Sequence, residues 1–196
     1  MQAVRFVGVG RPAQIEDVTK PSAGPGQVLI RIGGAGVCHS DLHVMEEDLG
    51  FKPPFTLGHE NAGWVAALGE GVAGFKEGDA VAVYGPWGCG RCHACQLSME
   101  NYCENWAQLD GFGGGLGVDG GMAEYMRVPS ARLLVPLGEL SPAKVAPLSD
   151  AALTPWANAV DGVTSKTSNG RIRAHCLSSP SVMCIGSPLN RRCSEW

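Results

Sequence analysis

The sequence predicts a mainly β fold, a barrel or a sandwich, that carries a small metal-binding lobe. Short runs rich in apolar and β-branched residues recur along residues 1–156, and glycine, proline or aspartate separates them. The chain holds 28 glycines among 196 residues, which favours strands joined by tight turns over a helical bundle. Four cysteines in the run CGRCHACQLSMENYC indicate the lobe.

Six short strands are expected, each bounded by residues that favour turns. The second is entered from the turn-forming run PSAGPG at residues 21–26. The expected strands are Ala3–Val9, Val28–Ile32, Gly63–Leu68, Ala80–Tyr84, Met122–Val128 and Leu133–Val135.

Two helices are expected between the strands. One begins near His39, directly after Cys38. The other has Ser141 as its N-cap and Pro142 at its first helical position, and runs towards Leu148.

Composition and charge place the chain among globular proteins. It is 44% hydrophobic and 17% charged, and its net charge of −4 is unlike that of a nucleic-acid binder. The N-terminal run MQAVRFVGVG lacks the pattern of a signal peptide, and no stretch has the length of a membrane span. We therefore expect a cytoplasmic protein without membrane or nucleic-acid partners, whose eight cysteines are reduced thiols and metal ligands.

The composition changes near Ala157. Residues 157–196 carry five Lys/Arg and two Asp/Glu, whereas residues 1–156 carry ten and seventeen. The segment is also rich in serine and poor in large apolar residues, so it offers little to offset the cost of ordering the chain. We expect a domain at residues 1–156 and a disordered tail at 157–196.

The four cysteines of the lobe are Cys89, Cys92, Cys95 and Cys103, with the spacing C-x2-C-x2-C-x7-C. Four thiolates satisfy a tetrahedral Zn²⁺ and leave no open position. Residues 89–103 are therefore expected to hold a structural zinc.

A second candidate metal site combines Cys38 with the pair His59-Glu60. One thiolate, one imidazole and a carboxylate suit a zinc that keeps an open position. Spacing alone does not show that these residues converge. A cysteine before a helix is more often a buried small residue, and an isolated His-Glu pair is more often a surface turn.

The run GHENAGWVAALGEGV resembles the zinc signature of the medium-chain alcohol dehydrogenases, G-H-E-x-x-G-x5-G-x2-V. The pieces GVCHSD, GDAVAVYGPWGCGRCHAC, ENYC and MAEYM follow that family's order, and the four-cysteine spacing is similar to that of its structural zinc. The resemblance covers residues 1–156 and implies a GroES-like β-barrel. Within the family the sequence looks most similar to bacterial NAD-dependent enzymes for secondary and aryl alcohols.

The resemblance implies that Cys38 and His59 are ligands of a catalytic zinc. Asp150 falls at the position of the third protein ligand, where many relatives have cysteine, and Glu60 matches an acidic neighbour of the metal. Such a zinc would polarise an alcohol oxygen and favour loss of a hydride to NAD. The implied cofactors are therefore two Zn²⁺ per chain and NAD, and the implied ligands are small alcohols, aldehydes and ketones.

Further roles follow from the same resemblance. Ser40 and His43 match a relay for the alcohol proton, with His43 at its outer end. His39 and Thr154 match residues that contact the cofactor. Trp87 matches a substrate-pocket position, although a core tryptophan is an equally good interpretation.

Relatives continue into a Rossmann domain that binds NAD, whereas residues 157–196 contain no G-x-G-x-x-G. Three interpretations stand at this point. The chain is the catalytic half of an alcohol dehydrogenase and is inactive alone, or a non-catalytic zinc-binding module, or an interaction protein with a basic tail. Family members are usually homo-oligomers, and the sequence does not settle the state of this chain.

Overall fold

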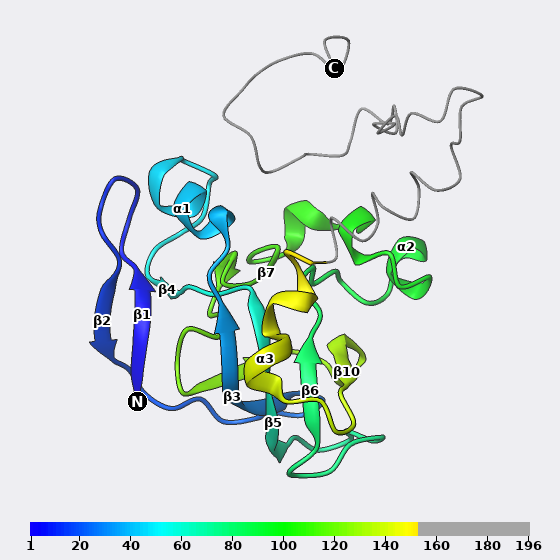
Figure 1. The fold of residues 1–196 in the computed structure, drawn as a ribbon. Helices are drawn as coiled ribbons and strands as arrows, with labels where there is room; N and C mark the ends of the chain where they lie inside the picture. The colour runs from blue at the N-terminus through cyan, green and yellow to red at the C-terminus, as the bar shows by residue number, and fades with distance from the viewer. Residues whose placement is uncertain (153–196) are drawn as a thin grey trace, which may run out of the picture.

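The computed structural model describes residues 1–152, which form a mostly antiparallel β structure with short helices at its edges (Figure 1). The mainly β class expected from the sequence is confirmed. The boundary expected near Ala157 and the expected tail lie outside the described residues. No helix in the described part is long and apolar enough to cross a membrane.

The larger sheet has five strands in the order β10-β6-β5-β3-β9, all paired antiparallel. Its centre is the long pair formed by β3 and β5, with register shifts after Leu29 and after Ile32. The strands are β3 (Val28–Gly36), β5 (Glu60–Leu68), β6 (Ala80–Val83), β9 (Tyr125–Val128) and β10 (Leu134–Pro136).

A second antiparallel sheet has the order β2-β1-β4, with β1 at Gln2–Phe6, β2 at Gln14–Asp17 and β4 at Phe55–Thr56. A bridge between Ala3 and Ala123 connects β1 to the segment that leads into β9. Two-residue strands β7 (Gly113–Gly114) and β8 (Gly117–Val118) pair in parallel nearby. The bridge thus links the smaller sheet to the chain that enters the larger one.

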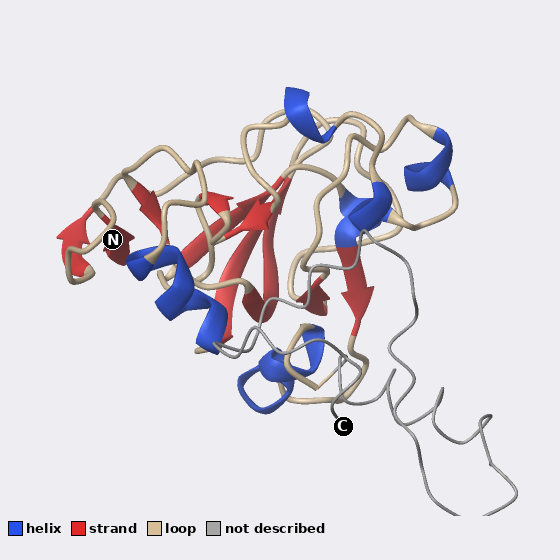
Figure 2. Ribbon diagram, turned by 90° about the horizontal axis from the view of Figure 1, so that it is seen from above, coloured by secondary structure: helices blue, strands red, loops and turns tan. Residues whose placement is uncertain are grey.

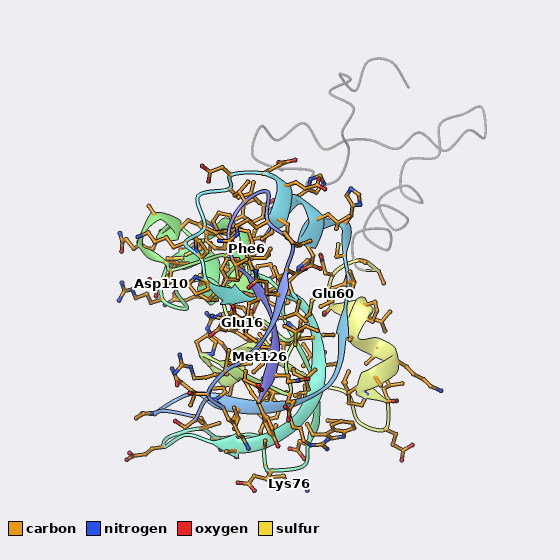
Figure 3. The ribbon with its side chains drawn as sticks, turned by 90° about the vertical axis from the view of Figure 1, so that its left-hand side faces the viewer. Phe6, Glu16, Glu60, Lys76, Asp110 and Met126 are labelled. Carbon is orange, nitrogen blue, oxygen red and sulfur yellow. The ribbon has the colours of Figure 1, made fainter. Side chains whose placement is uncertain are left out.

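The main core lies on the inner face of the five-stranded sheet. Val28, Leu29 and Ile30 of β3 are all buried, whereas Arg31, the next residue, is exposed and lies over the Trp64 ring. Strand β3 is therefore covered at its start and first meets solvent at Arg31. Met126 of β9 packs into this cluster, and Phe6 of β1 packs into a second one (Figure 3).

Short helices connect the strands and lie around them (Figure 2). Helix α1 (His39–Glu46) begins directly after Cys38, as expected. The expected helix after Ser141 is a short α3 (Pro142–Val145) followed by the 3₁₀ turn η4 (Ala146–Ser149). The remaining helical segments are α2 (His93–Gln96), η1 (Glu100–Tyr102), η2 (Trp106–Gln108) and η3 (Ala131–Leu133).

The six expected strands all exist, with shifted ends. Strand β3 runs four residues past the expected end at Ile32, and β5 begins at Glu60 instead of Gly63. The β3 extension, GGAG at residues 33–36, consists of small residues, which lets it pair closely with β5 up to the pair Gly36–Glu60. As a result Cys38, just after the end of β3, and His59, just before the start of β5, lie at the same end of this strand pair.

Candidate functional site

Three elements far apart in the sequence bring Cys38, His59 and Asp150 together. Cys38 follows β3 and is the N-cap of α1, His59 directly precedes β5, and Asp150 follows η4. The Cys38 sulfur, one ring nitrogen of His59 and one carboxylate oxygen of Asp150 all lie within 4.8 Å of one another. His59 Nε2 is 3.1 Å from Asp150 Oδ2. The sequence therefore folds to place a thiol, an imidazole and a carboxylate around one point.

Asp41 contacts both His59 and Cys38, and the sequence patterns had not singled it out. Its Oδ1 lies 3.3 Å from His59 Nδ1, and its Oδ2 accepts a hydrogen bond from the Cys38 backbone N–H at 3.0 Å. Asp41 is only 2% exposed. A carboxylate behind a histidine fixes the ring so that the other nitrogen points to a metal.

The electrostatics of the cluster suit a metal cation. Burial disfavours a charged His59 ring, but contacts with the Asp150 and Asp41 carboxylates outweigh burial and raise the pKa of His59 to about 11. The same His59 contact lowers the pKa of Asp150. Both ring nitrogens are buried without a well-aligned hydrogen bond. A cation held between these groups would give Nε2 a well-aligned partner, so the donor set fits Zn²⁺.

Glu60 lies beside the cluster and is not one of its three members. The side chain is 1% exposed, and Oε1 accepts a hydrogen bond from the backbone N–H of Ala151 at 2.8 Å. It thus contacts the residue that follows Asp150.

The expected relay residues lie on α1. Ser40 Oγ is 3.6 Å from Cys38 Sγ. His43 Nδ1 is 3.0 Å from Glu47 Oε1, and its ring meets that of exposed His39 edge-on at 4.9 Å between centroids. No hydrogen bond joins Ser40 to His43 in the part of the chain that the structure describes. Thr154, the other expected cofactor contact, lies outside the described residues.

The lobe gathers Cys89, Cys92, Cys95 and Cys103, whose sulfurs lie within 4.8 Å of one another. The sulfurs of Cys89 and Cys95 are 4.0 Å apart. Ligands of a tetrahedral zinc with Zn–S bonds of 2.3 Å would be roughly 3.8 Å apart. The four thiols therefore already stand near the separation that a zinc requires.

Hydrogen-bond donors around the sulfurs also favour the thiolate form. Backbone N–H groups of Cys92 and Asn105 donate to Cys89 Sγ and Cys103 Sγ at 3.4 Å each. A backbone hydrogen bond from Arg91 and a side-chain one from Asn105 lower the pKa of Cys89 to about 5, whereas burial raises the pKa of Cys95 to about 12. A metal is what would let the buried Cys95 ionise together with its neighbours.

An ion pair fastens the lobe to the sheet. Arg132 of η3 binds the Glu100 carboxylate, and its second amino group donates to the Gly88 carbonyl at 2.8 Å. Glu100 is 5% exposed, so this buried charge depends on its arginine. The sequence contained no signal for this pair, because its members are 32 residues apart.

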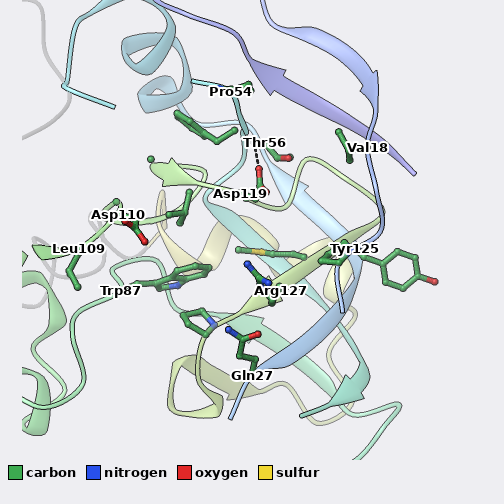
Figure 4. Close-up of a pocket in the computed structure, with 18 of the residues that line it drawn as sticks. Val18, Gln27, Pro54, Thr56, Trp87, Leu109, Asp110, Asp119, Tyr125 and Arg127 are labelled. Atoms are coloured by element: carbon green, nitrogen blue, oxygen red, sulfur yellow. Dashed lines mark hydrogen bonds between the residues drawn. The ribbon is translucent and has the colours of Figure 1, made fainter. Parts of the chain in front are cut away.

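Trp87 packs in the main core, its Nε1 donating to the Tyr84 carbonyl at 2.9 Å. Its edge lines a groove of about 740 Å³ together with Asp110 and Arg127 (Figure 4). Neither Cys38, His59 nor Asp150 lines that groove. In this structure the core interpretation of Trp87 fits better than the pocket interpretation.

Residues 24–139 match the family described as the alcohol dehydrogenase GroES-like domain. The match covers more than half of the chain, so the chain belongs to the zinc-type medium-chain alcohol dehydrogenase family. The GroES-like fold expected from the sequence is thereby confirmed.

Particular relatives agree with this family. An NAD-dependent alcohol dehydrogenase from Sulfurisphaera tokodaii is 41% identical over 166 residues, which are 80% of this chain and 46% of that protein. A D-arabinose 1-dehydrogenase (NADP(+)) from Saccharolobus solfataricus is 47% identical over 146 residues, 73% of this chain and 40% of that protein. The structure of a cobalt- and zinc-bound thermostable alcohol dehydrogenase from Pyrobaculum aerophilum has a TM-score of 0.73 at 34% identity, over 83% of this chain and 48% of that one. The chain spans about half the length of the proteins that it matches.

Proposed function

We propose that this chain supplies the zinc-binding and alcohol-binding half of an NAD-dependent alcohol dehydrogenase, which oxidises alcohols to aldehydes or ketones. One observation carries the proposal: Cys38, His59 and Asp150 meet within 4.8 Å although they lie up to 112 positions apart in the sequence. A mixed thiolate, imidazole and carboxylate set leaves a fourth position for substrate, as catalytic zinc sites do.

Two zinc ions per chain are proposed, one at this centre and one in the four-cysteine lobe. The lobe offers four sulfurs and no open position, so its zinc is structural. When bound at the centre, zinc supplies Lewis-acid polarisation of the alcohol oxygen. The protein's own residues hold the ligands in place: Asp41 orients His59, and Glu60 holds Ala151.

Residues of α1 are proposed to handle the alcohol proton. Ser40 lies next to Cys38 and is proposed to accept it, and His43, about one helical turn further along α1, is proposed to receive it next. Glu47 accepts from the His43 ring and would stabilise the ring when it takes the proton. His39 is exposed at the start of the helix and is proposed to meet the cofactor.

The site for NAD is proposed to involve more than residues 1–152. All pairs in the two larger sheets of the described region are antiparallel, unlike the parallel βαβ units that bind dinucleotides. Residues 1–152 alone would not hold the pyrophosphate and so would not position the nicotinamide for hydride transfer, and such positioning can be worth ~7–11 kcal/mol of the reaction barrier. We therefore propose that the 196-residue chain has little dehydrogenase activity alone.

Secondary and aryl alcohols are the proposed substrates, on the strength of the sequence resemblance. A panel of primary, secondary and aryl alcohols and aldoses would test this in a chimera that joins residues 1–152 to the cofactor-binding half of the Sulfurisphaera tokodaii relative. A preference for aldoses would instead align the chain with the D-arabinose 1-dehydrogenase.

The purified 196-residue chain tests the main proposal through zinc content, calorimetric titration with NAD and alcohol oxidation. We expect two zinc ions in the wild type, one in Cys38→Ser, and no saturable NAD binding. A wild type with zinc in the lobe alone would favour a non-catalytic zinc-binding module, because the four-cysteine site is complete within the chain. Saturable NAD binding with turnover would show that the chain carries a cofactor site of its own.

A further inference from the structure

The Glu60 carboxylate connects the start of β5 to the segment that carries Asp150. Glu60 Oε1 accepts a hydrogen bond from the Ala151 backbone N–H at 2.8 Å, across 91 positions of sequence. In Figure 3 the Glu60 label lies beside the upper end of the yellow segment that contains α3 and η4. The contact therefore reaches from the sheet to the residue directly after Asp150.

The surroundings of Glu60 hold its side chain in this direction. Gly36 is its partner across the pair of β3 and β5, and the Glu60 carboxylate occupies the space in which a side chain at position 36 would begin. Glu60 makes no ion pair among the described residues. A buried carboxylate without a partner is costly, so the Ala151 N–H also serves the stability of Glu60 itself.

The segment around Asp150 has few other anchors. The turn η4 ends at Ser149, and Asp150 has the non-helical angles φ −144° and ψ −74°. The backbone N–H of Asp150 is 3.5 Å from the Pro147 carbonyl, which is a long hydrogen bond. The Asp150 side chain is 40% exposed. The Ala152 N–H donates to the Pro147 carbonyl at 3.1 Å and Ser149 Oγ donates to the Ala146 carbonyl at 2.8 Å, but neither of these local hydrogen bonds reaches the Asp150 carboxylate.

We propose that Glu60 is a positioning residue for Asp150. By holding the Ala151 amide, Glu60 keeps the Asp150 carboxylate 3.1 Å from His59 Nε2, where it completes the metal-binding cluster. This inference rests on the proposed metal centre of Cys38, His59 and Asp150. It differs from direct binding of the metal by Glu60, because a positioning role needs a hydrogen-bond acceptor at this place and does not need a negative charge.

Glutamine and leucine at position 60 separate the two roles. Glu60→Gln keeps a carbonyl oxygen for the Ala151 N–H and removes the charge, whereas Glu60→Leu has a similar size and no acceptor. The full chain is prepared with zinc only in the four-cysteine lobe and is titrated with Co²⁺, whose visible absorption reports its ligands. Asp150→Ala is the benchmark for loss of one ligand.

For a positioning role, Glu60→Gln binds Co²⁺ within about threefold of the wild type. Glu60→Leu binds about 10–100-fold more weakly, with a spectrum that matches that of Asp150→Ala. Adding Asp150→Ala to Glu60→Leu then weakens binding little further, because the two residues act as a unit. Amide hydrogen exchange on the wild type gives a second measurement, in which the Ala151 N–H is protected.

Three results would overturn the inference. Equal loss of affinity in Glu60→Gln and Glu60→Leu would make Glu60 a direct ligand, and wild-type affinity in Glu60→Leu would leave it no role. If Glu60→Leu does not fold, two other results decide against the inference. One is rapid hydrogen exchange of the Ala151 amide in the wild type, and the other is a Co²⁺ spectrum of Glu60→Gln that matches that of Asp150→Ala. A wild type that binds no second metal would remove both the proposed centre and this inference. Weaker Co²⁺ binding in Asp150→Ala together with wild-type Co²⁺ affinity in Glu60→Leu would remove this inference alone.

Discussion

Asp41 Oδ1 lies 3.3 Å from His59 Nδ1, and the other oxygen of the same carboxylate accepts the N–H of Cys38. One buried side chain thus contacts two members of the proposed metal centre, one through its ring and one through its backbone. Asp41 also closes the N-terminal capping box of α1. The start of the helix and the metal centre are therefore fixed by the same group.

Asp41→Asn should weaken metal binding at the centre about 10–100-fold, because the neutral amide orients and polarises His59 less well. Co²⁺ titration of the chain with a zinc-filled lobe measures this. Asp48→Asn is the matched control, since Asp48 is exposed and, among the described residues, accepts only the Gly50 N–H. Equal affinities of the two variants would contradict a supporting role for Asp41.

Cys103→Ser should destabilise the protein more than Cys38→Ser, although each variant loses one zinc. A structural zinc contributes to folding, with apparent binding free energies of ~10–16 kcal/mol in small domains, whereas the centre forms between elements that the sheet already holds. Metal analysis and denaturant unfolding of both variants measure this. Equal losses of stability would mean that the two sites do not differ in role.

Arg132→Ala should lower the free energy of unfolding by about 1–3 kcal/mol, because it leaves the Glu100 carboxylate buried without its partner. Replacing Glu100 by Gln in the same chain should recover part of the loss, since no unpaired charge then remains. Arg127→Ala is the control, because Arg127 is exposed and makes no ion pair among the described residues. Chemical unfolding with zinc present compares the three, and similar losses in Arg127→Ala would argue against a specific fastening of the lobe.

The elements that local sequence defines were predictable. Four cysteines within fifteen residues predicted a lobe, and the structure places all four sulfurs together. Helix α1 was predicted from the segment after Cys38, and Asp41 at its third position carried a capping signal that could have been used. Strand β2 was missed because its sequence QIED is mostly polar, and β4 because it has only two residues.

Contacts between distant segments were not predictable from patterns. Asp150 was identified through the family resemblance, and nothing in residues 147–152 indicates that Glu60 binds Ala151. The Arg132–Glu100 pair could not be predicted either. Arg132 lies in η3 and Glu100 in the cysteine-rich lobe, and no sequence periodicity relates these two segments. Such pairs depend on how the sheet curves, which the alternation of apolar residues does not encode.

Ser40→Ala should slow alcohol oxidation by about 10²-fold in a chimera with the cofactor-binding half of the Sulfurisphaera tokodaii relative, because it interrupts the proposed proton path. His43→Gln should also slow turnover, because it removes the outer member of the same path. Steady-state rates across pH 5–9, with metal content verified, measure both. Unchanged rates and profiles would remove both residues from the path.

The stability of the protein with zinc only in the lobe should depend on pH through His59. Asp150 and Asp41 raise its pKa from 6.5 in the unfolded chain to about 11 in the folded one, against the effect of burial. Below pH 6.5 the ring is charged in both states, and its contacts stabilise the fold fully. Between pH 6.5 and about 11 the unfolded ring loses its proton first, so the stabilisation declines as pH rises. Wild type should therefore lose about 1–3 kcal/mol of unfolding free energy between pH 6 and pH 9 relative to His59→Gln.

Occupation of the centre by zinc reverses this dependence of stability on pH, since a zinc ligand must be a neutral imidazole and metal affinity rises with pH. Urea unfolding of both proteins at several pH values, with and without a second equivalent of zinc, measures both trends, and a difference between wild type and His59→Gln that is constant with pH would contradict the proposed contacts.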